Sequence, residues 1–208
     1  VIRTDEVLRQ KSEIELKNRD ILDNLQYAKR IQEAILPEIK LIYRTLQDSF
    51  IIYIPKDIVS GDFYSFAQKN DRVIIAASDC TGHGVTGAFM SMIGTSLLNQ
   101  IINENGVTQP AEILTDLNTG IVEALKQSEG ENEVHDGMDI ALCSIDLANT
   151  RLVYAGANRP LWFFKNGEMS LVKPTKSAIG GYQSSRTEEF TQHEIQLSKG
   201  DTIYLFTD

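Results

Sequence analysis

Cysteine is scarce in this chain: only Cys80 and Cys143 occur among 208 residues, and they form no Cys-x-x-Cys pair. A disulfide framework or a zinc site is therefore not indicated, and the apolar neighbours of both residues predict buried, reduced thiols. No apolar run approaches the length of a membrane span, and no signal-peptide pattern opens the chain. Because the first residue is Val1 rather than methionine, we expect a cytoplasmic fragment of a longer protein, with no membrane contact of its own.

Two common catalytic signatures are also absent. The glycines at positions 82, 84 and 87 are not followed by Lys-Ser or Lys-Thr, which excludes a P-loop. No serine or cysteine between glycines is paired with a well-placed histidine, so covalent catalysis has no support.

Basic side chains are fewer than acidic ones, and the difference is unevenly distributed along the chain. The formal net charge is −9; residues 1–36 carry seven basic and seven acidic side chains, whereas residues 37–208 carry 13 basic and 22 acidic ones. An acidic body argues against nucleic acid as the main partner and suits a site in which carboxylates surround cations.

The first 36 residues contain neither glycine nor proline and follow a seven-residue apolar repeat. The repeat consists of Val7, Ile14, Ile21, Ala28 and Ile35, and charged residues occupy the remaining faces. This pattern predicts a long helix that ends before Pro37 and forms a homodimer through a coiled coil. The alternative is a helix packed on its own domain.

The rest of the chain alternates between predicted strands and helices. Strands are expected at 49–54 and 63–66 as a hairpin, and at 73–78; helices are expected at 86–103 and 110–127, and an acidic loop at 128–134. Further strands are expected at 139–145, 151–155, 161–164, 169–172, 190–195 and 202–206, with a hairpin turn at Asn166-Gly167. Strands followed by helices and then strands indicate an α+β fold with antiparallel sheets.

Aspartates stand beside glycines in two short segments and end a third. Residues 60–64 read Ser-Gly-Asp-Phe-Tyr, residues 79–84 read Asp-Cys-Thr-Gly-His-Gly, and the chain closes on Leu-Phe-Thr-Asp. Asp79 and Asp208 follow apolar strand-like runs, so carboxylates at strand ends predict an oxygen-ligated divalent metal centre. The alternative is that Asp79 caps a helix and Asp62 makes a turn.

In order and spacing, these segments resemble the motifs of the metal-dependent protein phosphatases, the PPM family, and most closely its bacterial SpoIIE/RsbU branch. The resemblance covers roughly residues 46–208 and includes Asp-Gly-Met-Asp-Ile at 136–140 and Tyr-Ala-Gly-Ala-Asn-Arg-Pro-Leu at 154–161. It implies an α/β/β/α sandwich of antiparallel sheets flanked by helices, with metals at one end of the sheets. The expected organisation is a coiled-coil signalling helix at 1–37 and a phosphatase domain at 38–208.

The resemblance also implies a site and a substrate. Asp79 matches the aspartate that bridges two Mn²⁺ or Mg²⁺ ions, Cys80 supplies a backbone carbonyl ligand, and Asp62 and Asp208 complete the set. The implied reaction is hydrolysis of phosphoserine or phosphothreonine on a signalling protein, through water activated by two metals. In this branch the usual partner is a STAS-type anti-anti-sigma factor.

Several residues keep two interpretations. His83 is either a general acid or a histidine that shapes the loop at a helix N-terminus. Asp136 and Asp139 either supply a third metal position or are turn and surface carboxylates. Arg159 either contacts phosphate, because its fork matches phosphate oxygens, or is a solvated arginine.

The family continues beyond the Phe-Thr-Asp motif with a helix, a strand and another metal-binding aspartate, whereas this chain ends at Asp208. We therefore expect that the C-terminal part of the fold is missing, that one metal site lacks a ligand, and that the fragment alone is weakly active or inactive. The alternative function is a non-enzymatic pseudophosphatase or dimerisation module that acts as a signalling scaffold.

Overall fold

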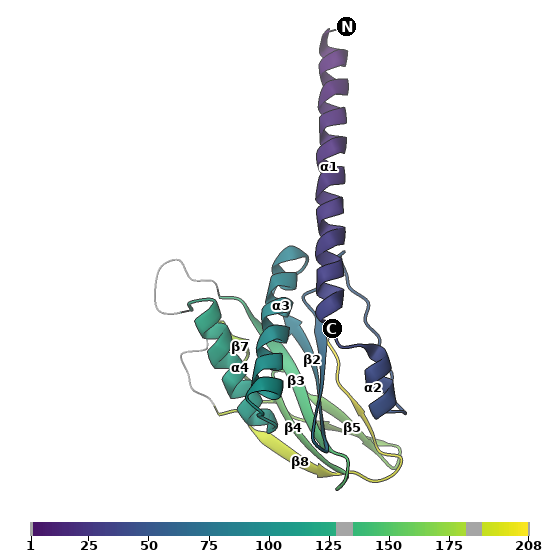
Figure 1. The fold of residues 1–208 in the computed structure, drawn as a ribbon, viewed down its shortest axis with the longest axis vertical. Coiled ribbons are helices and arrows are strands. Elements are labelled where there is room, and N and C mark those ends of the chain that lie inside the picture. Colours follow the sequence, from purple (N-terminus) through teal and green to yellow (C-terminus); the bar gives the residue numbers. More distant parts are fainter. Residues whose placement is uncertain (1, 128–134, 182–188, 208) are drawn as a thin grey trace.

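The computed structural model describes residues 2–127, 135–181 and 189–207, so the predicted acidic loop at 128–134 lies outside the described residues. Two antiparallel sheets and the helices around them make up the body of the molecule, and one long helix stands away from it (Figure 1). Both cysteines are buried and free, as the sequence predicts.

The long helix is α1 (Ile2–Ile35), which confirms the helix predicted over the first 36 residues. Ion pairs one turn apart, such as Lys17 with Glu13, lie on its surface and support it only weakly. Its repeat residues stay uncovered: Val7 is 59% exposed, Ile14 57% and Ile21 56%. The alternative of a helix packed along its own domain is therefore wrong for most of its length.

The segment after α1 differs from the prediction. A short helix, α2 (Ile39–Thr45), follows Pro37, and the strand expected at 49–54 is wrong. Apolar residues alternate there, but Phe50, Ile52 and Ile54 are largely exposed and the described residues offer the segment no strand partner. Alternation alone does not make a strand when no neighbouring strand satisfies its backbone groups.

The larger sheet has the order β1-β2-β3-β4-β8, and the short β7 pairs with the beginning of β3. Its strands are β1 (Phe63–Lys69), β2 (Arg72–Cys80), β3 (Gly137–Asp146), β4 (Arg151–Ala157), β7 (Ile179–Gly180) and β8 (Gln192–Gln196). The hairpin partner of β1 is therefore β2 rather than segment 49–54, and the tight turn between them uses Asn70 at a φ of 55°.

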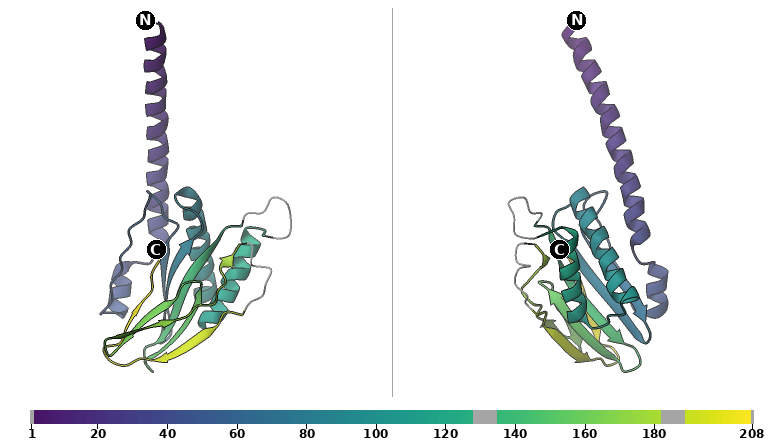
Figure 2. Two further views of the ribbon diagram at one scale, coloured as in Figure 1. Left: turned by 180° about the vertical axis from the view of Figure 1, so that it is seen from behind. Right: turned by 60° about the vertical axis from the view of Figure 1, so that its left-hand side comes forward.

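One face of this sheet is covered by α3 (Val85–Asn99), its π-helical continuation η1 (Gln100–Glu104) and α4 (Pro110–Ala124), as Figure 2 shows. Fully buried side chains of α4, among them Ile113 and Leu117, meet Ile74 and Leu142 of the sheet in the main core. Contrary to the sequence prediction, one segment of the described chain, Gly84–Glu104, is long and apolar enough to cross a membrane by length and composition (mean hydropathy 1.3). Packing of this segment against the sheet and α4 accounts for its apolar character.

A smaller sheet covers the other face in the order β6-β5-β9, formed by β5 (Leu161–Lys165), β6 (Glu168–Val172) and β9 (Thr202–Tyr204). Asn166 and Gly167, both at positive φ, make the predicted hairpin turn between β5 and β6. Tyr154 and Cys143 of the larger sheet pack with Leu161 in the second core. These elements confirm the α+β class and form successive helix, sheet and sheet layers of the expected sandwich.

We predict that Leu117→Ala lowers the free energy of unfolding by about 2–5 kcal/mol, because truncating a fully buried leucine leaves a cavity. The matched control is Leu147→Ala, since Leu147 is 42% exposed in the turn after β3 and should lose little. Urea unfolding followed by circular dichroism measures both changes. Equal losses in the two variants would contradict the placement of α4 in the core.

Candidate metal centre

Strand register brings the predicted aspartates to one end of the larger sheet. Asp79 lies directly opposite Asp139, because β2 and β3 run antiparallel. On the other side of β2, Phe63 pairs with Ser78, so Asp62 stands just before β1 at the same end. Since β2 ends where both neighbours begin, three carboxylates distant in sequence become neighbours in space.

A close approach of backbones joins the first two motifs. A Cβ atom added to Gly61 would lie 2.9 Å from the Gly82 carbonyl oxygen and 3.3 Å from that of Cys80. Gly87, at the start of α3, is equally tight, because its added Cβ would lie 2.8 Å from the Gly61 Cα. Only glycine leaves room for this contact, which holds the Cys80 carbonyl beside the chain that carries Asp62.

The pKa of the Cys80 thiol is raised by burial and by the nearby carboxylates. Burial raises its pKa, and the negative charges of Asp79, Asp62 and Asp136 raise it further. The thiol therefore stays protonated at neutral pH and is a poor metal ligand. What Cys80 can offer a cation is its backbone carbonyl, as the sequence predicts.

Asp62 is held at its backbone and at its carboxylate. Its amide donates to Ser60 Oγ at 3.0 Å, and its carbonyl accepts from the Tyr53 hydroxyl at 3.1 Å. The Thr207 hydroxyl donates to Asp62 Oδ2 at 3.1 Å. Asp208, the next residue, lies outside the described residues, so its predicted role as a ligand stays a prediction.

Arg159 is the principal cation at this end of the sheet. Its guanidinium forms an ion pair with Asp79 and places Nε 3.9 Å from Asp139 Oδ2. Asn158 donates to the other carboxylate oxygen of Asp139 at 2.8 Å, and the Tyr154 hydroxyl donates to the Arg159 carbonyl at 2.5 Å. The Arg159 side chain is only 18% exposed, so the alternative of a solvated arginine is wrong.

Asp136 is linked to the loop after β2 through the side chain of Thr81. Its carboxylate accepts a hydrogen bond from the Thr81 hydroxyl at 2.8 Å, and that hydroxyl accepts one from the Gly137 amide at 3.0 Å. These bonds tie the loop after β2 to the start of β3. The described contacts therefore give Asp136 a structural role, while its predicted role in a third metal position stays a prediction.

His83 contacts a different carboxylate. Its Nδ1 lies 2.9 Å from Asp57 Oδ2, and the side chain is 75% exposed in the loop before α3. Gly84 takes the N-cap position of α3, which rules out Asp79 as the helix cap. The described contacts of His83 favour the loop-shaping interpretation, and its role as a general acid stays untested.

The donor set is chemically suited to a hard divalent cation. Carboxylate oxygens and a backbone carbonyl are the ligands that Mg²⁺ and Mn²⁺ prefer. In residues 2–127, 135–181 and 189–207, however, no three His, Cys, Asp or Glu side chains lie close enough together to hold an ion by themselves. Asp62, Asp79 and the Cys80 carbonyl therefore offer oxygens that suit such a cation, but among the described residues they are only part of the ligand set that a metal centre needs.

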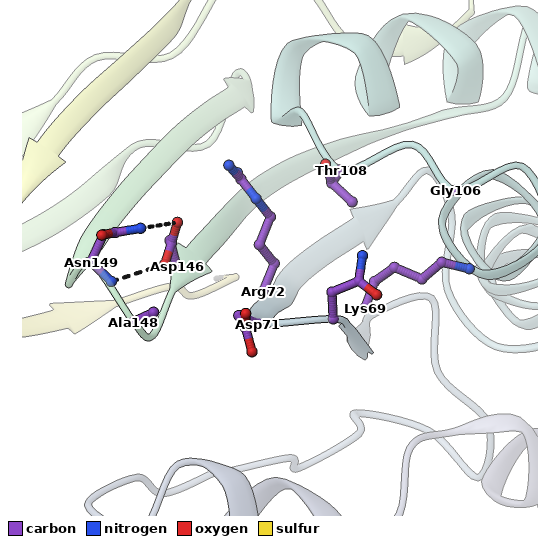
Figure 3. Close-up of a pocket in the computed structure, with 9 residues that line it drawn as sticks. Lys69, Asp71, Arg72, Gly106, Thr108, Asp146, Ala148 and Asn149 are labelled. Carbon is purple, nitrogen blue, oxygen red and sulfur yellow. Dashed lines mark hydrogen bonds between the residues drawn. The ribbon is translucent and has the colours of Figure 1, made fainter.

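A surface hollow at the opposite end of the sheet has a different character. It lies between the β1–β2 and β3–β4 turns, where Arg72 stands near Asp146 and Asn149, whereas the Lys69 side chain points away from them and donates to the Asn103 carbonyl at 2.9 Å (Figure 3). Since β2 runs from Arg72 to Cys80, the hollow is roughly 25 Å from Asp79. The Asp146 carboxylate is satisfied locally by hydrogen bonds from Asn149, so the hollow is no candidate for the metal site.

Two stacked antiparallel sheets, a helical layer and carboxylates at one strand end are the architecture of the PPM (PP2C) class of proteins. The chain belongs to the stage II sporulation protein E (SpoIIE) family, whose sequence profile matches residues 69–208. This membership confirms the branch that the motifs predict.

Individual relatives support the assignment. The chain is 26% identical over 196 residues to the phosphoserine phosphatase RsbU of Bacillus subtilis (strain 168), covering 91% of this chain and 54% of that protein. It thus spans about half the length of this curated relative. The SiaA-PP2C domain of Pseudomonas aeruginosa matches with a TM-score of 0.79 and 32% identity over 91% of this chain and 72% of that one. RsbX in complex with magnesium matches with a TM-score of 0.50 and 17% identity over 70% of this chain and 64% of that one, which shows the fold alone.

The sequence analysis missed the ion pair of Arg159 with Asp79 and the contact of Thr207 with Asp62. Eighty residues separate the first pair and 145 the second, so only the folded sheets bring the partners together. Residues 154–161 resemble a family motif, but no local pattern indicates that the cation of Arg159 faces Asp79.

We predict that Gly61→Ala destabilises the protein by about 1–3 kcal/mol and weakens Mn²⁺ binding, since the new methyl group meets backbone atoms that cannot rotate away. The matched control is Gly120→Ala, whose methyl group meets only the flexible Leu97 side chain and gains helix propensity. Differential scanning calorimetry measures stability, and isothermal titration calorimetry measures Mn²⁺ binding. Wild-type stability for Gly61→Ala would contradict the close approach.

Proposed function

We propose that this protein is a metal-dependent serine/threonine phosphatase that removes phosphate from a signalling protein. The observation that carries the proposal is the convergence of Asp62, Asp79 and Asp139 at one end of the sheets in a SpoIIE-family fold. The similarity to RsbU, a phosphoserine phosphatase, supports this proposal.

In this proposal Asp79 is the central ligand, and Asp62, the Cys80 carbonyl and Asp208 complete the centre for Mn²⁺ or Mg²⁺. Two bound cations would supply an activated water and neutralise phosphate oxygens. The crystallised complex of RsbX with magnesium is consistent with such a cation in this fold. Gly61 and Gly87 keep the two loops close enough for their oxygens to act together.

Arg159 has two tasks in the proposed reaction. Its guanidinium balances the charge of Asp79 and Asp139, which stabilises the cluster of carboxylates. A phosphate group arriving at this end of the sheet would offer the fork a second set of oxygens with matching geometry. Tyr154 holds the Arg159 backbone in place for either contact.

We propose a phosphorylated STAS-type anti-anti-sigma factor as the substrate and the cytoplasm as the location. Both follow from the family resemblance, and neither depends on a contact in this chain. The rival proposal is a non-enzymatic pseudophosphatase or scaffold, which would have the same fold but would not turn over substrate. The two proposals are separated by activity measured on the full-length protein.

We predict that Asp79→Asn in the full-length protein lowers Mn²⁺-dependent dephosphorylation of a phosphoserine STAS protein by more than about 100-fold, because the central ligand loses its charge. Release of inorganic phosphate measures activity, and circular dichroism checks folding. The matched control is Asp71→Asn, an exposed aspartate in the β1–β2 turn at the far end of the sheet.

Activity of Asp79→Asn within tenfold of the wild type would exclude the bridging role. Absence of turnover in the wild-type full-length protein, with Mn²⁺ bound, would favour the pseudophosphatase.

We also propose that α1 forms a parallel coiled-coil homodimer. The apolar seam through Ile14 and Ile21 is more than half exposed along a helix that extends away from the body (Figure 1). An isolated helix with an uncovered apolar seam gains stability by pairing with a second copy.

We predict that Ile14→Asp combined with Ile21→Asp makes the protein monomeric, since like charges would face each other across the seam. The matched control is Ser12→Asp with Gln26→Asp, which adds the same charge on the outward face of the helix. Light scattering measures the mass of both variants. A dimer that survives the seam substitutions would show that α1 pairs differently or not at all.

A further inference from the structure

Among the described side chains of α1, residues 5–35, only Gln32 is buried; it is 4% exposed, although it is polar. Burying an amide is unfavourable unless its donors and acceptor are satisfied. The place where α1 joins the body is therefore specified by hydrogen bonds, in addition to the apolar contact that Leu36 makes with the main core just after the helix.

The side-chain amide of Gln32 forms two hydrogen bonds with the backbone of Ser60. Nε2 donates to the Ser60 carbonyl at 2.7 Å, and Oε1 accepts from the Ser60 amide at 3.0 Å. The same Nε2 also donates to Ser91 Oγ of α3 at 2.8 Å. The Ser91 hydroxyl also lies 3.3 Å from the Ser60 carbonyl oxygen, so α1, α3 and the backbone of Ser60 meet at the Gln32 amide.

Ser60 is directly connected to the candidate centre. Its hydroxyl accepts the Asp62 amide at 3.0 Å, and the intervening Gly61 is packed against the carbonyls of Cys80 and Gly82. A displacement of Ser60 therefore moves Asp62 and the loop that carries the Cys80 carbonyl. Ser60 is therefore the single residue that links Gln32 of α1 to Asp62 of the candidate metal centre through hydrogen bonds.

The seam of α1 runs beside this contact. Ala28 and Ile35 belong to the apolar repeat, and Gln32 stands between them, one turn from each. A rotation or shift of α1 within a helix pair would displace the Gln32 amide. Its two hydrogen bonds to Ser60 tolerate little change in length or direction, so Ser60 would move with it.

We propose that Gln32 is a positioning residue that sets the geometry of the Ser60–Asp62 loop and transmits the position of α1 to the metal centre. The strand that the sequence predicts at 49–54 is absent from the structure, so it offers no path between α1 and the first aspartate motif. This proposal rests on the proposed function for its catalytic consequence, but its structural and metal-binding consequences can be measured without turnover.

The test compares Gln32→Leu with Gln26→Leu in the full-length protein. Gln26 is an exposed glutamine of the same helix on the face away from the seam, so it controls for the chemical change. In the metal-free protein, hydrogen exchange at the Ser60 and Asp62 amides should accelerate about tenfold in Gln32→Leu, because the Ser60 amide loses its acceptor. Amides of β3 and β4 should keep their rates, and Gln26→Leu should match the wild type throughout.

Isothermal titration calorimetry should show that Mn²⁺ binds Gln32→Leu about tenfold more weakly, and high Mn²⁺ should restore much of its phosphatase activity. A folded Gln32→Leu variant with Mn²⁺ affinity within twofold of the wild type would overturn the proposal. Were Gln32→Leu not to fold, Ser91→Ala removes one partner of the amide and should weaken Mn²⁺ binding two- to threefold. Unchanged affinity in Ser91→Ala would then overturn it.

Transmission is tested by combining Gln32→Leu with the seam substitutions Ile14→Asp and Ile21→Asp. The seam substitutions should change Mn²⁺ affinity in the otherwise wild-type chain and leave it unchanged in the Gln32→Leu background. Equal effects in both backgrounds, or none in either, would show that α1 does not act through Gln32. If the wild-type protein shows no turnover, the proposed function fails, while exchange and calorimetry still decide the role of Gln32.

Discussion

The antiparallel pairing of β2 with both β1 and β3 is the constraint on which the candidate site depends. It places the end of one strand beside the beginnings of two others, and each of those positions carries an aspartate: Asp79, Asp62 and Asp139. A register slip of one residue would turn these carboxylates to the opposite face of the sheet. The buried apolar face of α4 and the second sheet hold this register, because slippage would expose their apolar contacts.

Gathering carboxylates at one strand end carries an electrostatic cost, and the structure offsets it locally. Arg159 pairs with Asp79 and lies near Asp139, while Thr81 donates to Asp136 and Thr207 to Asp62. Burial is the main cause of the raised pKa of the Cys80 thiol, and the negative charges of Asp79, Asp62 and Asp136 add to it. A site with these negative charges attracts divalent cations without needing a preformed cage of protein ligands.

The attachment of α1 illustrates how a buried polar contact can specify geometry. An apolar side chain at position 32 could bury similar area, but it would accept many orientations of the helix. An amide that must satisfy Ser60 and Ser91 together accepts very few. The same contact that fixes the helix therefore constrains the loop beside Asp62, and it joins the exposed apolar repeat of α1 to the candidate site through a short physical path.

The sequence alone determined the long helix, the α+β class and most strands, because these depend on local periodicity, on Pro37 and on turn residues such as Asn166-Gly167. It also determined the family, and with it the identities of Asp62 and Asp79 as candidate ligands, since glycine-flanked aspartates at fixed spacing are a local pattern. The failed strand at 49–54 shows the limit of that approach: alternation was present, but a strand also needs a neighbour.

Only the tertiary structure decided which side chains meet. The pairing of Arg159 with Asp79, the contact of Thr207 with Asp62 and the grip of Gln32 on Ser60 join residues separated by 80, 145 and 28 positions. No local propensity encodes such contacts, because they follow from sheet register and from how helices pack on the sheet. In the sequence Gln32 is one polar residue of an amphipathic helix, and only the fold shows that it is buried against Ser60, beside Asp62.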